Sequence, residues 1–201
     1  MVDILVFVDH TDGATRKGSL EALGEAARRA ADAAGAVDAG LVGPGCSGWA
    51  ANLGAVGVRN VYTADDAVFT SYSPDGFALA VAKAARVAGS SCVLFSATSR
   101  GRDLSGRVAA RLEAACAADC TAMAWTDGSW VFTRPVYAGK AFTQVRCTTS
   151  VAVATLRPNV FPQVPAAPGA ATVVALEAGV TAGDLKSVVT AFHASVGGEV
   201  D

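Results

Sequence analysis

The sequence predicts a three-layer α/β/α domain whose sheet is mostly parallel and carries an antiparallel extension. Short apolar runs of strand length alternate with segments of helical periodicity through about residue 120. Such alternation is typical of parallel sheets that are covered by helices on both faces. Strand-like segments separated only by short turns follow it, which predicts the antiparallel part. The chain of 201 residues is long enough to bury the core of one such domain.

The strands predicted in the first half are short, apolar and rich in β-branched residues, which favours burial in a parallel sheet. They cover residues 4–8, 37–42, 58–62 and 92–96. The segments between them carry apolar residues at helical spacing and charged residues on the opposite face. The predicted helices cover residues 20–34, 47–53, 77–87 and 104–115.

The first helix has predicted boundaries and a predicted solvent face. Ser19 is placed to cap it, and Gly35 to end it. Glu21 and Glu25 are expected on the face that points away from the sheet. Glu25 also lies one turn before Arg29, which predicts an ion pair between them.

The second half of the chain predicts a meander rather than further helices. Its strand-like segments cover residues 122–125, 130–133, 142–147 and 151–156, and Asp127-Gly128 and Ala138-Gly139 are predicted turns. A proline-rich loop is predicted over 158–168, a strand over 173–176 and a closing helix over 184–192. We expect the domain to cover residues 1–195, and residues 196–201 to form a frayed tail.

The composition excludes several classes of protein. Hydrophobic residues make up 52% of the chain and charged residues 17%, which argues against a disordered chain. The formal net charge of -2 argues against a nucleic acid partner. No apolar run is long enough to cross a membrane, and the N-terminus lacks the features of a signal peptide. We therefore expect a soluble protein with no nucleic acid partner and no membrane insertion.

The cysteines do not predict a metal site. Cys116 and Cys120 would share one face only if a helix ran through both, and two further ligands would still be needed. The histidines His10 and His193 lie far from them in sequence. We expect reduced, mostly buried thiols. The cysteines are Cys46, Cys92, Cys116, Cys120 and Cys147.

A polar, glycine-containing loop between the strand at 92–96 and the next helix is the most informative stretch for function. Ligands of open α/β sheets bind at the carboxyl ends of strands, and helix N-termini attract anions. The alternative is structural: Asp103 caps the helix and pairs with Arg107, while the arginines hold a neighbouring loop or subunit. Spacing alone favours this alternative. The candidate anion or nucleotide loop consists of Thr98, Arg100, Gly101, Arg102 and Asp103.

Other motifs give no catalytic residue. The chain has no P-loop, no GxGxxG after its first strand and no GxSxG elbow. His10 is expected to be a hydrogen-bonding loop residue, and Asp65-Asp66 a solvated turn or helix cap rather than a cation site. The segment from Arg134 to Lys140 places two cations around a tyrosine and a glycine turn, and it is a candidate contact for a partner or a ligand phosphate.

Several segments resemble one known family. Residues 98–112, TSRGRDLSGRVAARL, resemble the alpha-subunit signature of electron transfer flavoproteins. Residues 134–141, RPVYAGKA, and 155–161, TLRPNVF, are similar to two further family segments. Residues 4–10 and 61–66 also fit, in the same order. On these segments, which span residues 4–161, the chain is identified as a member of this family.

The sequence departs from the family pattern in two places. Gly106 stands where the family usually has proline, and we expect it to loosen the first turn of the helix. Family members also continue into a second domain that carries most of the FAD contacts. None of the glycine-rich stretches of that domain occurs in this chain, so no flavin ligand is carried over.

The resemblance implies both a fold and a role. The fold would be Rossmann-like and similar to adenine nucleotide alpha hydrolases. The family carries single electrons from flavin dehydrogenases to a membrane-bound quinone oxidoreductase, or bifurcates electrons in some anaerobes, and FAD rather than a side chain does this chemistry. A beta subunit that holds AMP completes the heterodimer. The compartment would be the mitochondrial matrix or the bacterial cytoplasm.

The alpha N-terminal domain would then be a scaffold and not an enzyme. We expect its interface or loop-anchoring residues to be Arg102, Asp103, Arg107, Arg134, Tyr137 and Lys140. Two alternatives stay open. The chain is a stand-alone module that binds AMP or ATP near residues 98–103, or it is a degenerate relative that is kept as a scaffold in a larger assembly.

Overall fold

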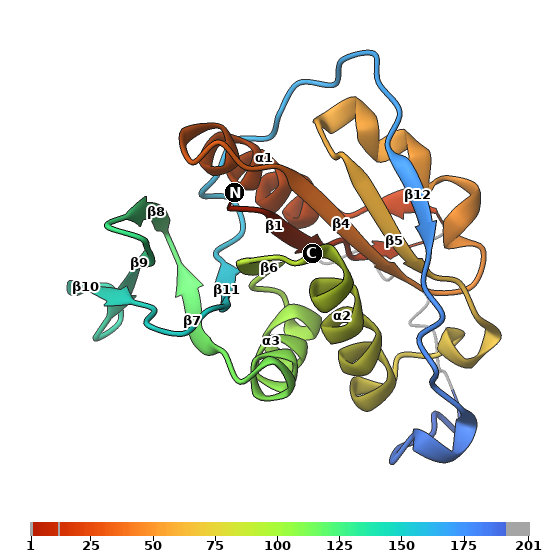
Figure 1. Cartoon of the computed structure of the whole chain (residues 1–201). Helices are drawn as coiled ribbons and strands as arrows, with labels where there is room; N and C mark the ends of the chain where they lie inside the picture. The colour runs from red at the N-terminus through yellow and green to blue at the C-terminus, as the bar shows by residue number, and fades with distance from the viewer. Residues whose placement is uncertain (1, 12, 192–201) are drawn as a thin grey trace, which may run out of the picture.

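A seven-stranded, fully parallel sheet forms the centre of the computed structural model, which describes residues 2–11 and 13–191 (Figure 1). Helices cover both of its faces, so the predicted three-layer α/β/α fold is confirmed. The strands, in spatial order, are β12 (Thr172–Ala175), β5 (Asn60–Ala64), β4 (Val37–Val42), β1 (Ile4–Phe7), β6 (Cys92–Ser96), β11 (Ala152–Leu156) and β7 (Ala115–Cys120).

β1 lies in the middle of the sheet and connects its two halves. Ile4 pairs in register with Val37 of β4 on one side and with Cys92 of β6 on the other. The chain adds β4 and β5 on one side of β1 and then crosses to β6 on the other side. This crossing is a topological switch point, where open α/β sheets place their ligands.

The two faces of β1 belong to two separate hydrophobic cores. Ile4 and Val6 pack with helix α1 (Lys17–Asp32) and with the short 3₁₀ helices η1 (Cys46–Gly48) and η2 (Ala50–Val56). Leu5 and Phe7 pack with α2 (Pro74–Ala88) and α3 (Ser99–Leu112). Because side chains alternate across a strand, an all-apolar strand is what a sheet with two covered faces requires.

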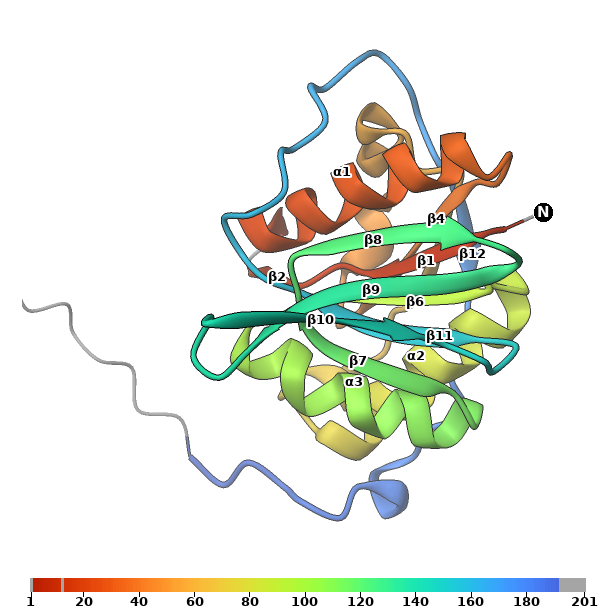
Figure 2. The same cartoon turned by 90° about the vertical axis from the view of Figure 1, so that its left-hand side faces the viewer.

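The antiparallel extension is a separate sheet of three strands. β8 (Ala122–Thr126), β9 (Ser129–Val136) and β10 (Ala141–Arg146) pair in the order β10-β9-β8. This sheet lies across the β7 side of the main sheet (Figure 2), and Trp130 and Phe132 bury their rings in the core below α1.

Two predictions for this region are wrong. Residues 151–156 do not belong to the meander, because β11 inserts between β6 and β7 of the parallel sheet. All five residues of β11 are buried, as expected for a strand that is covered on both faces. The helix predicted over 104–115 begins earlier and ends at Leu112, so Cys116 and Cys120 lie on strand β7.

The segment 157–171 is a strap that returns from β11 over α1 to β12 at the opposite edge of the sheet (Figure 1). It corrects the prediction that Glu21 and Glu25 face solvent, because both are buried beneath it. Glu21 accepts a hydrogen bond from the backbone N–H of Asn159 at 2.7 Å. Glu25 pairs with Arg28 and with Arg29, each at 2.8 Å, so the predicted Glu25–Arg29 pair is confirmed.

Three further helix predictions differ from the structure. The helix predicted over 47–53 is replaced by the 3₁₀ helices η1 and η2. α1 begins before Ser19, whose hydroxyl instead accepts the backbone N–H of Asp9 at 2.9 Å. The closing helix predicted over 184–192 is wrong within the described residues, where a single 3₁₀ turn, η4 (Ala182–Asp184), is followed by non-helical chain through residue 191. Phe192, His193 and the predicted tail at 196–201 lie outside the residues that the structure describes.

None of the helices in the described part of the chain is long and apolar enough to cross a bilayer. All five cysteines are free, as expected for reduced thiols. Cys46, Cys92, Cys120 and Cys147 are buried, and Cys116 is exposed. Burial raises the pKa of both Cys46 and Cys120 to about 12, so these thiols stay protonated at neutral pH.

We expect one thiol, Cys116, to react rapidly with Ellman's reagent in the folded protein. Burial protects the other four thiols from the reagent. All five should react in about 6 M guanidinium chloride, which unfolds most domains. The measurement is the fast amplitude in wild type and in Cys116→Ser, which should lose it. A second fast thiol in wild type would contradict the burial of Cys46 in η1, Cys92 in β6, Cys120 in β7 or Cys147 after β10.

Candidate binding site at the carboxyl edge of the sheet

The first turn of α3 organises the carboxyl edge of the sheet. Thr98, and not Asp103 as predicted, caps this helix, since its hydroxyl accepts the backbone N–H of Gly101 at 3.2 Å. Gly101 packs directly on the end of β6, where a Cβ atom would overlap the carbonyl oxygen of Ser96. Two of the candidate loop residues, Thr98 and Gly101, therefore fix the helix in place.

Arg100 points from this turn toward the switch point. Its guanidinium donates to the Asp9 carboxylate at 2.6 Å, just beyond the end of β1. The same guanidinium lies 5.1 Å from the ring centre of Tyr72 and 5.9 Å from that of Phe77. Asp9 is buried, and Arg16 approaches it at 3.5 Å from its other side. Asp9 therefore anchors two cations at the carboxyl end of the central strand.

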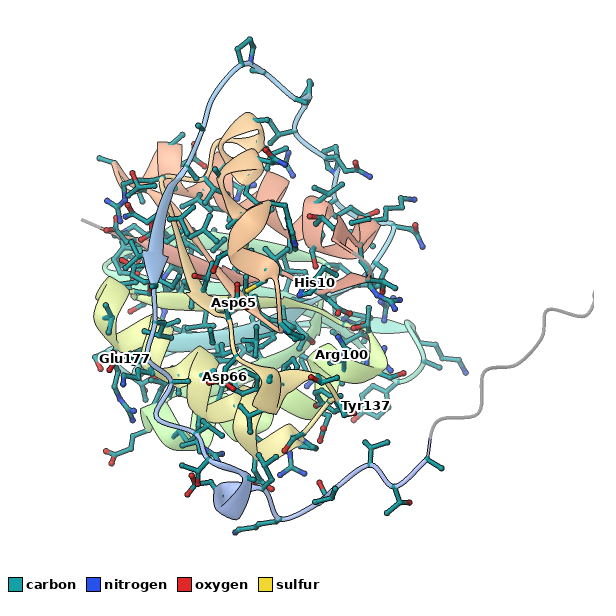
Figure 3. The ribbon with its side chains drawn as sticks, turned by 90° about the vertical axis from the view of Figure 1, so that its right-hand side faces the viewer. His10, Asp65, Asp66, Arg100, Tyr137 and Glu177 are labelled. Atoms are coloured by element: carbon teal, nitrogen blue, oxygen red, sulfur yellow. The ribbon has the colours of Figure 1, made fainter. Side chains whose placement is uncertain are left out.

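A cleft of about 590 Å³ lies beside this pair. Its walls include His10, Arg16, Trp49, Tyr72 and Arg100, together with the glycine turn at 43–45 after β4. Figure 3 shows His10 and Arg100 close together at this edge. The Nε2 atom of His10 lies 3.2 Å from the carbonyl oxygen of Val42, so His10 is the hydrogen-bonding loop residue that was predicted. We refer to this cleft as the switch-point cleft.

Arg102 points to the other side of the same turn. Its guanidinium lies 3.8 Å from the Asp119 carboxylate, which Arg157 holds with two bonds of 3.1 and 2.5 Å. A bulge in β7 aims Asp119 at these arginines, because Ala118 and Asp119 together oppose Thr155 of β11. The hydrogen bonds from Arg157, with weaker help from Arg102 and Arg134, lower the pKa of Asp119.

A second hollow of about 590 Å³ opens beside Asp119. Arg134 and Tyr137 of the β9–β10 hairpin form its far wall, and Tyr137 and Gly139 hold the turn at φ values of 52° and 85°. The Tyr137 side chain is 81% exposed. We name this site the arginine hollow. It is lined by Asp119, Arg134, Pro135, Val136, Tyr137, Ala138, Gly139 and Arg157.

The other predicted residues lie outside both sites. Asp103 accepts the Tyr72 hydroxyl at 2.6 Å and pairs with Arg107 at 3.1 Å, as the structural alternative predicted. These two contacts lower the pKa of Asp103. Arg107 also lies 3.5 Å from Asp75 on α2, so it joins two helices. Lys140 is exposed at the end of the hairpin turn.

Of the acidic pair at residues 65 and 66, Asp66 is a helix cap, as predicted, whereas Asp65 holds the loop after β4. Asp66 caps the 3₁₀ helix η3 (Ala67–Phe69) by accepting the backbone N–H of Val68 at 2.8 Å. Asp65 accepts the backbone N–H groups of Gly45 and Ser47 at 2.6 and 3.0 Å. Within residues 2–11 and 13–191, no three acidic, histidine or cysteine side chains converge as metal ligands.

Asp9, Asp119 and Arg157 belong to these sites but were not predicted from the sequence. Asp9 carried a usable signal, since it directly follows the central strand and open sheets bind ligands there. Asp119 and Arg157 carried no such signal, because 38 residues separate them and only the bulge brings them together.

Comparisons with known proteins agree on one family. A family model described as "Electron transfer flavoprotein domain" matches residues 4–181. The chain is 35% identical to the electron transfer flavoprotein subunit alpha of Bacillus subtilis over 78% of its own length and 47% of the relative. It is 32% identical to the electron transfer flavoprotein subunit alpha of Syntrophomonas wolfei, over 98% of its own length and 60% of the relative. It is 33% identical to Protein FixB of Clostridium saccharobutylicum, over 92% of its own length and 56% of the relative. The chain spans about half the length of the curated relatives it matches.

We expect Gly101→Ala to destabilise the protein by about 1–3 kcal/mol, because the added methyl group overlaps the end of β6. Gly106→Ala is the matched control in the same helix. Gly106 was expected in the first turn of the helix, but it lies further inside α3. A Cβ atom added at Gly106 would point into open space. Alanine should stabilise this position by about 0.5–1 kcal/mol. Urea unfolding measures both variants, and equal effects would contradict the close packing at Gly101.

Proposed function

Because the chain belongs to the electron transfer flavoprotein family, we propose that it is the N-terminal domain of an alpha subunit and scaffolds a heterodimeric electron carrier. The match over residues 4–181 carries this proposal, since it covers nearly all of the described chain. The carrier would take electrons from flavin dehydrogenases and deliver them to a quinone oxidoreductase. We place it in the bacterial cytoplasm or the mitochondrial matrix.

FAD, which supplies the electron-transfer chemistry, would bind mainly outside the residues that the structure describes. Diphosphate groups of such cofactors need free backbone N–H groups in a glycine-rich turn at a helix N-terminus. The corresponding turn here is already used, because Thr98 caps it and Arg100 is paired with Asp9. This chain would therefore contribute no catalytic side chain and few flavin contacts.

We place the contact with a beta-type subunit on the exposed side of the antiparallel sheet. β10 is an edge strand, and Phe142 on it is 65% exposed. Tyr137, at 81% exposed, stands next to Arg134 at the end of the same hairpin. Exposed aromatic side chains beside arginine are typical of the residues that dominate binding energy in protein interfaces.

Co-expression with the host's beta-type subunit tests this role. We expect a stable complex on size-exclusion chromatography, and little absorbance near 450 nm for the chain alone. The double variant Tyr137→Ala/Phe142→Ala should weaken the complex at least about tenfold, a typical cost of losing interface aromatics. Val87→Ser, which removes an exposed apolar side chain on α2, should leave it unchanged.

Two results would contradict the proposal. Failure of the pair to form would remove the scaffold role. A complex that loses affinity with Val87→Ser but not with the hairpin variant would keep the role and move the interface to α2.

A second candidate function rests on the switch-point cleft, whose aromatic walls and two arginines suit a purine nucleotide. It predicts that the chain alone binds AMP or ATP in calorimetry. Arg16→Gln should weaken this binding about tenfold. The Arg16 side chain is largely exposed, so we expect the variant to fold, which circular dichroism checks. Wild-type protein without measurable AMP or ATP binding would remove this candidate.

A further inference from the structure

We propose that the arginine hollow binds the phosphate group of an organic phosphate ester. The proposal does not depend on the electron-carrier role, because it concerns the chain alone. Arg134 and Tyr137 also lie on the face that we place against the beta-type subunit, so that subunit and the ligand would compete for these two residues. It begins with an imbalance of charge around the hollow. Three guanidinium groups, those of Arg102, Arg134 and Arg157, surround the single carboxylate of Asp119. In the described residues Arg102 and Arg157 pair with Asp119, whereas Arg134 has no carboxylate within ion-pair distance.

Arg134 also has an unused hydrogen-bond donor. Its Nε atom is buried and has no acceptor among the described residues. Buried donors without partners are rare in folded proteins, and they call for an explanation such as a missing ligand. An arginine side chain donates only, so the missing partner must be an acceptor.

Asp119 is held in place before any ligand arrives. The lining of the hollow comes from the ends of β7 and β11 and from the β9–β10 hairpin, and Arg102 approaches Asp119 from the first turn of α3. Asp119 is fixed by its two bonds to Arg157, and its backbone N–H donates to the Thr155 hydroxyl at 2.8 Å. Thr155 itself is fully buried. Such preorganisation lowers the entropy that a ligand loses on binding.

Phosphate fits this site better than a single carboxylate does. Three cations against one anion leave a surplus of two positive charges, which matches a phosphate dianion. Guanidinium groups recognise phosphate oxygens through paired N–H bonds. The exposed ring of Tyr137 at the rim can stack on a planar group that is attached to the phosphate. A nucleotide is the simplest molecule with both parts.

The experiment is calorimetry on the full chain with AMP, adenosine, inorganic phosphate and acetate as probes. We expect AMP to bind more tightly than inorganic phosphate, and adenosine not to bind measurably. Arg134→Gln should weaken both phosphate-bearing probes at least about tenfold, the effect expected for a charge-assisted contact. Tyr137→Ala should weaken AMP and leave inorganic phosphate unchanged.

Arg146→Gln is the matched control. It removes one exposed arginine from the opposite end of β10, where Arg146 pairs with Asp127, and it should change affinity by less than about twofold. Arg134→Lys keeps the charge but loses the paired donors, so it tests the site if Arg134→Gln fails to fold. Circular dichroism establishes folding for each variant.

Three outcomes would overturn the proposal. One is equal weakening by Arg134→Gln and Arg146→Gln, which indicates general charge attraction only. Another is acetate binding as tightly as phosphate, which would assign the hollow to carboxylates. The third is AMP binding that is lost in Arg16→Gln but kept in Arg134→Gln, which would place the nucleotide in the switch-point cleft.

Discussion

The structure of this protein depends on the contact between the first turn of α3 and the end of β6. Gly101 allows the helix backbone to lie against Ser96, and Thr98 closes the turn through its hydroxyl. No residue with a Cβ atom fits at position 101 without displacing the strand. The helix is therefore fixed in both position and direction at the carboxyl edge of the sheet. This contact decides where the nearby charged side chains can point.

Two arginines on this turn lie on opposite sides as a result. Arg100 reaches the buried carboxylate of Asp9 after the central strand, and Arg102 faces Asp119 at the far edge. The turn therefore divides the carboxyl edge into the switch-point cleft and the arginine hollow. Asp9 is shared by two arginines, so its cleft has a surplus of one positive charge, whereas the arginine hollow has a surplus of two. A net charge of -2 for the chain hides this local difference, because only spatial clustering creates a potential.

The sequence predicted those parts of the molecule that follow from local pattern. The buried central strands were recognised as apolar runs, and the Glu25–Arg29 and Asp103–Arg107 pairs from their spacing on a helix. It failed where a distant segment changes the surroundings of a residue. Glu21 and Glu25 have the pattern of a solvent face, but the strap at 157–171 covers them. The sequence pattern of β11 is the same as that of the antiparallel strands before it. Its position between β6 and β7 of the parallel sheet is known only from the structure.

The candidate site shows the same division between local and long-range information. The hairpin from Arg134 to Lys140 stood out in sequence because its composition is unusual for a surface turn. The arginine hollow beside this hairpin also contains Asp119, and no local sequence pattern predicts a role for Asp119. In β7, Asp119 adopts a φ of 60°, an uncommon conformation outside glycine that positions its carboxylate between Arg102 and Arg157. Tyr137 and Ala138 adopt similar values at the opposite wall. Non-glycine residues in this region cost of order 1–3 kcal/mol each and gather where function requires a fixed geometry. Tyr137 and Ala138 form a hairpin turn, where positive φ is ordinary, and Ala34, Glu113, Asp127 and Asn159 adopt similar values away from the hollow. Asp119 differs from these turn residues because it lies within a strand, so its conformation at the bulge is the one that a binding role would explain.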